Sequence, residues 1–125
     1  MEKSLSYSGT LEIVVQKALQ YLKPTDRDVI YDIGAGDGRI ARLCYEYQPK
    51  SIVVVENDPV LMRVAKANLT AEKCTERITY LLQDCRDITY QDGTILFYTL
   101  PGFVENALDI VTKTMPSNAK LITFG

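Results

Sequence analysis

The chain of 125 residues contains no histidine and no tryptophan. Without histidine, catalytic triads and metal sites that depend on an imidazole are excluded. Cysteine is scarce as well: Cys44, Cys74 and Cys85 are odd in number and lack the close spacing of metal ligands. Neither a disulfide framework nor a metal site is therefore indicated, and buried reduced thiols of a cytosolic protein are expected.

An excess of positive charge and a long apolar run are also missing. The formal net charge is -2 and the isoelectric point is about 5.1, so no general electrostatic attraction to nucleic acid or membranes is expected. The N-terminus has no apolar signal core, and no run approaches the ~18 apolar residues of a membrane span. We therefore expect a cytoplasmic protein without membrane association.

The residues that are present predict one domain, 1–125, of alternating helices and strands. Hydrophobic residues make up 46% of the chain and charged residues 24%, as in ordinary globular proteins. Helical spacing of apolar residues predicts a helix over 10–22, with Thr10 as a candidate cap and Pro24 after its end. Further helices are expected at 40–47, after Pro59 and at 104–114, and strands at 29–33, 51–56, 77–82, 94–98 and 119–124. This alternation predicts an α/β fold with right-handed crossovers and a doubly wound parallel sheet.

A glycine-rich turn, Gly34-Ala35-Gly36-Asp37-Gly38, follows the first predicted strand. Glycines allow a tight turn and let backbone N–H groups approach a ligand at the start of the next helix, although such turns also serve as plain corners. A dinucleotide fingerprint requires glycine where the chain has Arg39, and the Gly-Lys-Ser/Thr ending of a phosphate-binding loop is absent. The Asp37 carboxylate would repel a pyrophosphate, so the loop favours a ligand that carries a cation.

Two acidic residues follow the next two predicted strands. Glu56 lies where doubly wound folds place a carboxylate that accepts hydrogen bonds from ribose hydroxyls, or it is a solvated strand-end charge. Asp84 is placed to accept from an exocyclic amine such as that of adenine, or it caps a turn. Taken with the glycine turn, the pattern favours a ligand with a ribose.

From Val29 to its end, the chain resembles the class I, Rossmann-like S-adenosylmethionine-dependent methyltransferases, and residues 32–40 look like their glycine motif. The resemblance implies S-adenosylmethionine as cofactor and about five strands in the order 3-2-1-4-5, without the usual last two. It also implies a methionine site at the loop, Glu56 at the ribose hydroxyls, Asn57 beside the adenine, and Asp84 with Cys85 at the adenine edge. The loop residues so implied are Asp32, Gly34, Ala35, Gly36 and Asp37.

Within that class, the segments 37–40 and 96–101 look most like small protein-lysine methyltransferases of archaeal and mitochondrial type. The resemblance implies N-methylation of a protein lysine. Tyr7 and Thr10 are similar to an aromatic-x-Pro-Thr/Ser segment of those proteins that implies cofactor contacts, but Gly9 replaces the proline. The candidate substrate wall follows the fourth strand and could also be an ordinary turn; it comprises Tyr98, Thr99, Leu100 and Pro101.

The acceptor stays open between three interpretations. The first is a methyltransferase acting on a protein, and the others are an RNA methyltransferase and a non-catalytic S-adenosylmethionine-binding or scaffold subunit. A sulfonium methyl group is already electrophilic, so the sequence identifies no catalytic base. A sheet without the last two strands leaves an apolar edge, through which a homo-oligomer can form.

Overall fold

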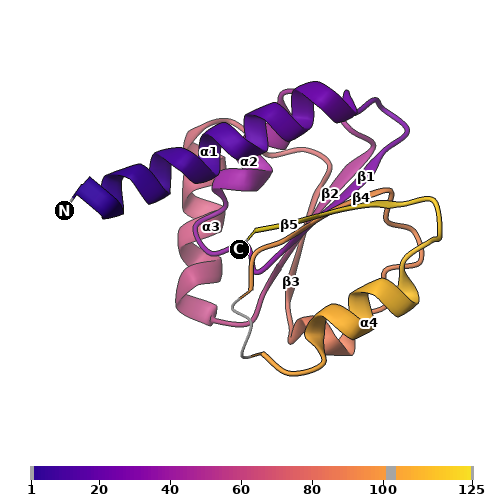
Figure 1. Cartoon of the computed structure of the whole chain (residues 1–125). Coiled ribbons are helices and arrows are strands. Elements are labelled where there is room, and N and C mark those ends of the chain that lie inside the picture. The colour runs from indigo at the N-terminus through magenta and orange to yellow at the C-terminus, as the bar shows by residue number, and fades with distance from the viewer. Residues whose placement is uncertain (1, 101–103, 125) are drawn as a thin grey trace.

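The structure is a computed structural model and describes residues 2–100 and 104–124, with only the helical backbone over 2–10. Five strands form a single sheet in the order β3-β2-β1-β4-β5, and helices lie on both of its sides (Figure 1). Each neighbouring pair is parallel, and Ile30 of the central strand pairs with Ile52 on one side and Ile95 on the other. The strands are β1 (Val29–Ile33), β2 (Ser51–Glu56), β3 (Ile78–Leu82), β4 (Ile95–Tyr98) and β5 (Lys120–Thr123). The predicted fold class and strand order are confirmed.

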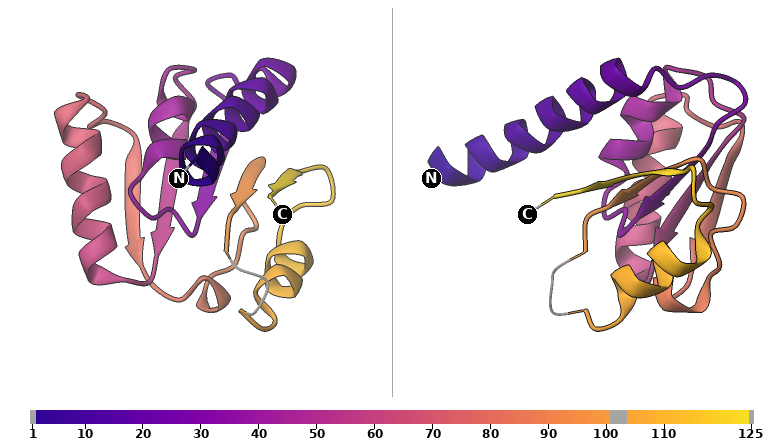
Figure 2. Two further views of the ribbon diagram at one scale, coloured as in Figure 1. Left: turned by 60° about the vertical axis from the view of Figure 1, so that its left-hand side comes forward. Right: turned by 45° about the vertical axis from the view of Figure 1, so that its right-hand side comes forward.

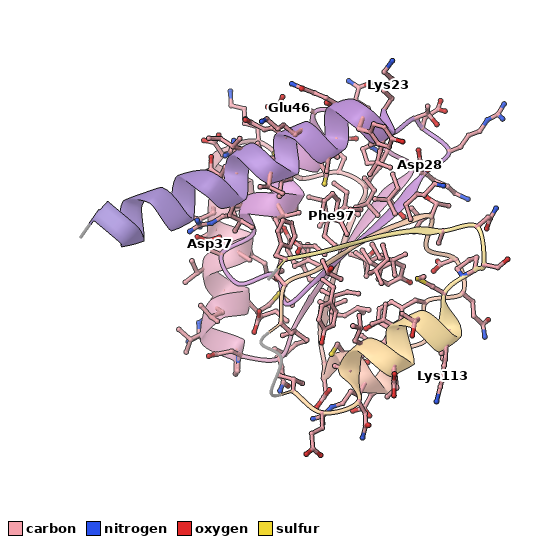
Figure 3. The ribbon with its side chains drawn as sticks, in the orientation of Figure 1. Lys23, Asp28, Asp37, Glu46, Phe97 and Lys113 are labelled. Atoms are coloured by element: carbon pink, nitrogen blue, oxygen red, sulfur yellow. The ribbon has the colours of Figure 1, made fainter. Side chains whose placement is uncertain are left out.

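The helices divide the core into two layers. Helices α1 (Glu2–Leu22), α2 (Arg39–Tyr45) and α3 (Pro59–Ala71) cover one face of the sheet, and α4 (Ala107–Thr114) with the short 3-10 helix η1 (Cys85–Asp87) covers the other (Figure 2). Phe97 of β4 is fully buried beneath the first group of helices (Figure 3). The three central strands are rich in apolar residues and are buried on both faces, with Asp32 of β1 as a buried charged residue.

Several predicted boundaries are corrected. The strand predicted from Arg77 begins at Ile78, because Arg77 has a φ of +63°, which a strand does not accommodate. The helix predicted from Val104 begins at Ala107, because Asn106 precedes it in the left-handed conformation. The second helix ends at Tyr45 and the fifth strand spans Lys120–Thr123, both shorter than predicted.

The first helix begins earlier than the sequence predicts. It starts at Glu2, so Thr10 lies inside it and the prediction of Thr10 as a cap is wrong. Serine and glycine are poor helix formers, and residues 4–9 contain three serines and Gly9. The apolar spacing therefore did not predict a helix over this segment. The N-terminal half of α1 extends beyond the sheet (Figure 2). No helix within the described residues is long and apolar enough to span a bilayer.

Candidate cofactor site

The glycine loop joins β1 to α2 and is tied to the end of β2. The backbone N–H groups of Gly34 and Ala35 both donate to the Val55 carbonyl, at 3.0 and 3.1 Å. Gly34 has a φ of +80°, and a Cβ there would lie 2.8 Å from Cδ2 of Leu100. Only glycine therefore combines this backbone conformation with the close approach of the chain after β4.

Glu56 fastens the loop through its carboxylate. Its Oε1 accepts the Gly36 backbone N–H at 2.8 Å, and its Oε2 accepts those of Asn57 and Asp58 at 3.1 and 3.0 Å. A carboxylate offers about four acceptor positions, so Glu56 keeps capacity for a further donor. The side chain can thus hold the loop and receive a ligand hydroxyl at the same time.

A cavity of about 210 Å³ opens where β1, β2, β3 and β4 end. In open α/β sheets, ligands bind outside the carboxyl ends of the strands, where this cavity lies. It brings together five of the predicted cofactor residues and Leu100 of the predicted substrate wall. Its lining consists of Gly34, Val55, Glu56, Asn57, Gln83, Asp84, Cys85, Arg86, Leu100 and Val104.

Asp84 stands on the wall of this cavity as an ion pair. Its Oδ2 lies 2.6 Å from Nη2 of Arg86, and its Oδ1 accepts from the Arg86 backbone N–H and Nε, both at 2.9 Å. Hydrogen bonding from Arg86 lowers the pKa of Asp84 to about 2. Asp84 also caps η1, and Nη1 of Arg86 donates to the Glu105 carbonyl at 3.3 Å. This charged wall is therefore linked to the segment that precedes α4.

Asp32 lies below the loop and does not line the cavity. Its side chain is fully buried, and neither carboxylate oxygen has a hydrogen-bond partner within the described residues. Burial raises the pKa of Asp32 to about 7. The nearby Ala41 backbone N–H favours the charged carboxylate and opposes this rise, whereas the negative charges of Glu56 and Asp37 increase it. Asp32 is therefore close to Glu56 but is not among the residues that line the cavity.

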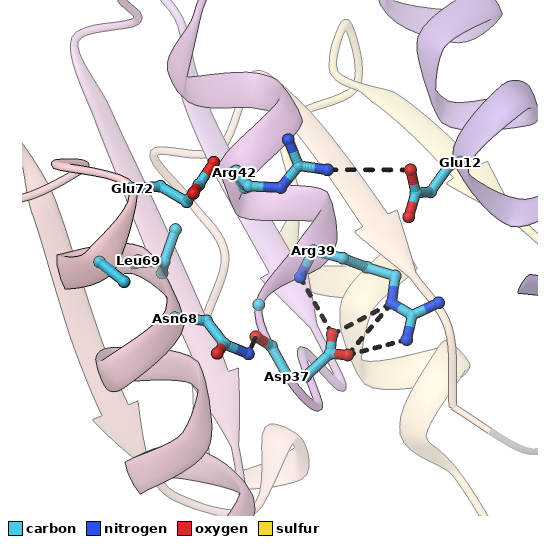
Figure 4. A pocket seen from close by; sticks show the side chains of 9 residues that line it. Glu12, Asp37, Arg39, Arg42, Asn68, Leu69 and Glu72 are labelled. Carbon is cyan, nitrogen blue, oxygen red and sulfur yellow. Dashed lines mark hydrogen bonds and ion pairs between the residues drawn. The ribbon is translucent and has the colours of Figure 1, made fainter. Parts of the chain in front are cut away.

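Asp37 lines a different and larger cavity, of about 430 Å³, between α1, α2 and α3 (Figure 4). Its Oδ2 pairs with Nη2 of Arg39 at 2.8 Å, and hydrogen bonding from Arg39 lowers the pKa of Asp37. Across the cavity, Arg42 lies 3.8 Å from Glu12. This cavity contains no strand residue and its guanidinium groups face carboxylates, so the smaller cavity is the candidate cofactor site.

The predicted substrate wall is divided between two places. Tyr98 is only 7% exposed and lines a third cavity, of about 270 Å³. Thr99 instead donates from Oγ1 to the Gly34 carbonyl at 2.8 Å, which ties the end of β4 to the glycine loop. Pro101 lies outside the described residues.

This third cavity contains acidic residues that the sequence analysis missed. Glu105 and Asp109 line it together with Tyr98, and Val104 borders both this cavity and the smaller one at the strand ends. Two carboxylates around the start of the helix that follows the fourth strand were the available signal. The arrangement places an acidic recess next to the candidate cofactor site.

The remaining predicted residues are placed as follows. Ala35 is buried in the loop, and the Gly36 N–H faces Glu56. Tyr7 lies in helix α1, and neither its side chain nor that of Thr10 is among those described. Among residues 2–100 and 104–124, no three acidic or cysteine side chains gather as metal ligands.

The side chains at the strand ends fit the cofactor that the sequence implies. Two carboxylates, Glu56 and Asp84, can accept from ribose hydroxyls and an adenine amine. Val55, Leu100 and Val104 supply apolar surface for a flat ring. The combination of few polar groups with an apolar lining is typical of a small-molecule site.

Several known methyltransferases are similar to this chain in sequence. The family model for ribosomal RNA adenine dimethylases matches residues 10–95. A demethylmenaquinone methyltransferase of Bacteroides fragilis is 27% identical over 96 residues, 76% of this chain and 39% of that protein. A protein-lysine N-methyltransferase of Saccharolobus islandicus is 30% identical over 91 residues, 72% of this chain and 56% of that protein. The chain thus spans well under two thirds of the length of these relatives.

Among solved structures, an RNA methyltransferase from Salinibacter ruber in complex with S-adenosylhomocysteine has a similar fold. The TM-score is 0.78 at 23% identity, over 88% of this chain and 72% of the other. This likeness supports the fold described above, a parallel sheet with helices on both faces.

Proposed function

Because the chain belongs to the ribosomal RNA adenine dimethylase family, within the class I S-adenosylmethionine-dependent methyltransferases, we propose that it transfers a methyl group from this cofactor to a protein lysine. The cofactor is S-adenosylmethionine. One observation carries the choice of acceptor: the acidic recess formed by Tyr98, Glu105 and Asp109 beside the candidate cofactor site.

In this proposal the cavity at the strand ends holds the cofactor. Glu56 accepts from the ribose hydroxyls, while Asn57, Asp84 and Cys85 face the adenine. The glycine loop, with Gly34 and Gly36 held by Val55 and Glu56, lies along the methionine part. Preorganised loop contacts of this kind lower the ordering cost of binding.

S-adenosylmethionine supplies a methyl group on a sulfonium that is already electrophilic. The remaining task of the protein is to orient the acceptor and exclude water. The Tyr98 side chain lines the recess, where its hydroxyl is placed to accept a hydrogen bond from the incoming amine. Glu105 and Asp109 attract the ammonium form from solvent. The ammonium releases one proton to water, and the neutral amine would then accept the methyl group, with S-adenosylhomocysteine as the leaving group.

Electrostatics favours a cationic acceptor over an anionic one. The net charge is -2, and the two carboxylates that line the recess would repel an RNA phosphate and attract a lysine side chain. This charge argument supports a protein acceptor.

Tritiated methyl transfer from S-adenosylmethionine to a cell extract tests the proposal. Label that protease removes and ribonuclease leaves is the expected result. A double variant, Glu105→Gln with Asp109→Asn, should lower transfer while binding S-adenosylhomocysteine like the wild type. The matched control is Glu76→Gln with Asp26→Asn, two exposed residues that line none of the described cavities.

A second candidate, an RNA acceptor, is favoured by the family model itself, which describes ribosomal RNA adenine dimethylases. It predicts label that ribonuclease removes and protease leaves. Binding of S-adenosylhomocysteine without any labelled product would instead indicate a non-catalytic binding subunit. Label that protease removes, label that ribonuclease removes, and binding without label each support a different one of the three candidates.

A further inference from the structure

The wall of the candidate cofactor site is held from behind by a buried tyrosine that no sequence motif singled out. Tyr90 is fully buried, and its hydroxyl donates to the Cys85 carbonyl at 2.7 Å. Cys85 lines the cavity at the strand ends and begins η1. The hydroxyl therefore reaches the backbone of the cavity wall from the core side.

That wall has little structure of its own. Helix η1 has only three residues, Cys85–Asp87, and 3-10 turns have poorer hydrogen-bond geometry than α-helices. Within the turn, the Asp87 N–H donates to the Asp84 carbonyl at 2.9 Å. The Asp84–Arg86 pair is partly exposed, and such pairs contribute little to stability. The buried bond from Tyr90 is thus the strongest candidate for fixing the position of the turn.

Tyr90 is itself held by two other elements. Its ring packs edge-to-face on Tyr31 of β1, with centroids 5.0 Å apart and planes at 75°. Its backbone N–H donates to Oγ1 of Thr114, at the end of α4, at 3.1 Å. The hydroxyl is consequently fixed relative to β1 and α4, and it transmits that position to the cavity wall.

We propose that Tyr90 is a positioning residue, whose hydroxyl sets the Cys85 carbonyl and so fixes the Asp84–Cys85 wall against which the cofactor lies. A purely packing role requires only the ring, which phenylalanine also provides. The hydroxyl adds the bond to the Cys85 carbonyl. Because a buried hydroxyl is unfavourable unless it is hydrogen-bonded, this bond constrains where the Cys85 carbonyl lies relative to Tyr90. The role rests on the proposed function, in which this cavity takes S-adenosylmethionine.

The test compares Tyr90→Phe with Tyr31→Phe. The second variant removes a similar bond, from the Tyr31 hydroxyl to Oδ1 of Asp92 at 2.6 Å, in the same cluster but away from the cavity. Tyr90→Phe should weaken S-adenosylhomocysteine binding, measured by calorimetry, by about three- to tenfold, the loss typical of one neutral hydrogen bond. Tyr31→Phe should bind like the wild type at a similar thermal midpoint.

Amide hydrogen exchange of the ligand-free proteins gives a second readout. Faster exchange at Arg86 and Asp87 in Tyr90→Phe alone is expected. Unchanged exchange there, or binding equal to the wild type, would overturn the positioning role. If the wild type does not bind S-adenosylhomocysteine, the proposed function fails, while exchange at Arg86 and Asp87 still decides whether Tyr90 positions the turn.

Discussion

Glu56 combines a structural role with a proposed binding role in one carboxylate. It accepts three backbone N–H groups, from Gly36, Asn57 and Asp58, and it borders the cavity at the strand ends. Its place at the end of β2 was predicted from sequence, whereas its hold on the glycine loop was not. A ligand hydroxyl bound there therefore meets an acceptor that is already fixed in orientation.

Replacing Glu56 by alanine removes this acceptor. We expect Glu56→Ala to weaken S-adenosylhomocysteine binding by about 1 to 3 kcal/mol, the usual range for polar partners left unpaired. Calorimetry measures the change, with Glu76→Ala, an exposed residue that lines none of the described cavities, as control. Equal affinities in the two variants would contradict a ribose contact by Glu56.

Asp32 has a distinct prediction, in the pH dependence of stability. Its folded pKa of about 7 lies above the ordinary 3.8 because the carboxyl is buried. Between about pH 4 and 7 the folded state therefore binds more protons than the unfolded state, and this contribution to stability falls as pH rises. Relative to Asp32→Asn, the wild type should lose at most about 4 kcal/mol across that window.

Urea denaturation of the two proteins at pH 4, 6 and 8 measures this loss. The difference in unfolding free energy between Asp32→Asn and the wild type should grow with pH and level off above about pH 8. A difference that is independent of pH would show that the pKa of Asp32 is the same in the folded and unfolded states, against this prediction.

Among the secondary-structure elements, the positions of the strands were predicted more accurately than the first residues of the helices. Strands β1, β2 and β4 are rich in apolar residues, and their predicted positions hold to within a residue. Arg77 and Asn106 limit β3 and α4 through positive φ angles. Asparagine is one of the few non-glycine residues that adopt this conformation, whereas nothing in the identity of Arg77 indicates it.

Side-chain direction explains why the predicted site divides. The carboxyl ends of parallel strands meet at one edge, which gathers Gly34, Glu56, Asp84 and Cys85. Successive strand residues point to opposite faces of the sheet, so Asp32 and Ile30 point to the same face, the one that α2 covers. Asp32 therefore does not line the cavity. The alternating direction of side chains along a strand can be predicted from the sequence. How deeply Asp32 is buried beneath α2 depends on the packing of the helix on the sheet.

Helix α3 offers a prediction about capping. Oδ1 of Asp58 accepts the N–H groups of Val60 and Leu61 at 2.8 and 3.4 Å, and Pro59 occupies the first helical position. Asp58→Ala should lower the unfolding free energy by about 1 kcal/mol, the typical loss of a capping side chain. Urea denaturation checks this against Asp26→Ala, and an equal effect of both would mean that the cap adds no stability.

For the whole molecule, the sheet places two recesses side by side, one suited to the cofactor and one that is acidic. They share Val104, and Arg86 links their walls through Asp84 and the Glu105 carbonyl. The strands at the two edges, β3 and β5, are only partly buried. Pairing through such an edge to form a homo-oligomer remains a prediction, and sedimentation of the purified chain measures it.

The central claim is that the cofactor lies at the carboxyl ends of the strands, although a larger cavity exists between α1, α2 and α3. A crystal structure with S-adenosylhomocysteine tests it most directly. We expect the ribose to lie against Glu56 and the sulfur to face the recess beside Tyr98. Ligand density beside Asp37, Arg39 and Arg42 in the larger cavity would contradict it.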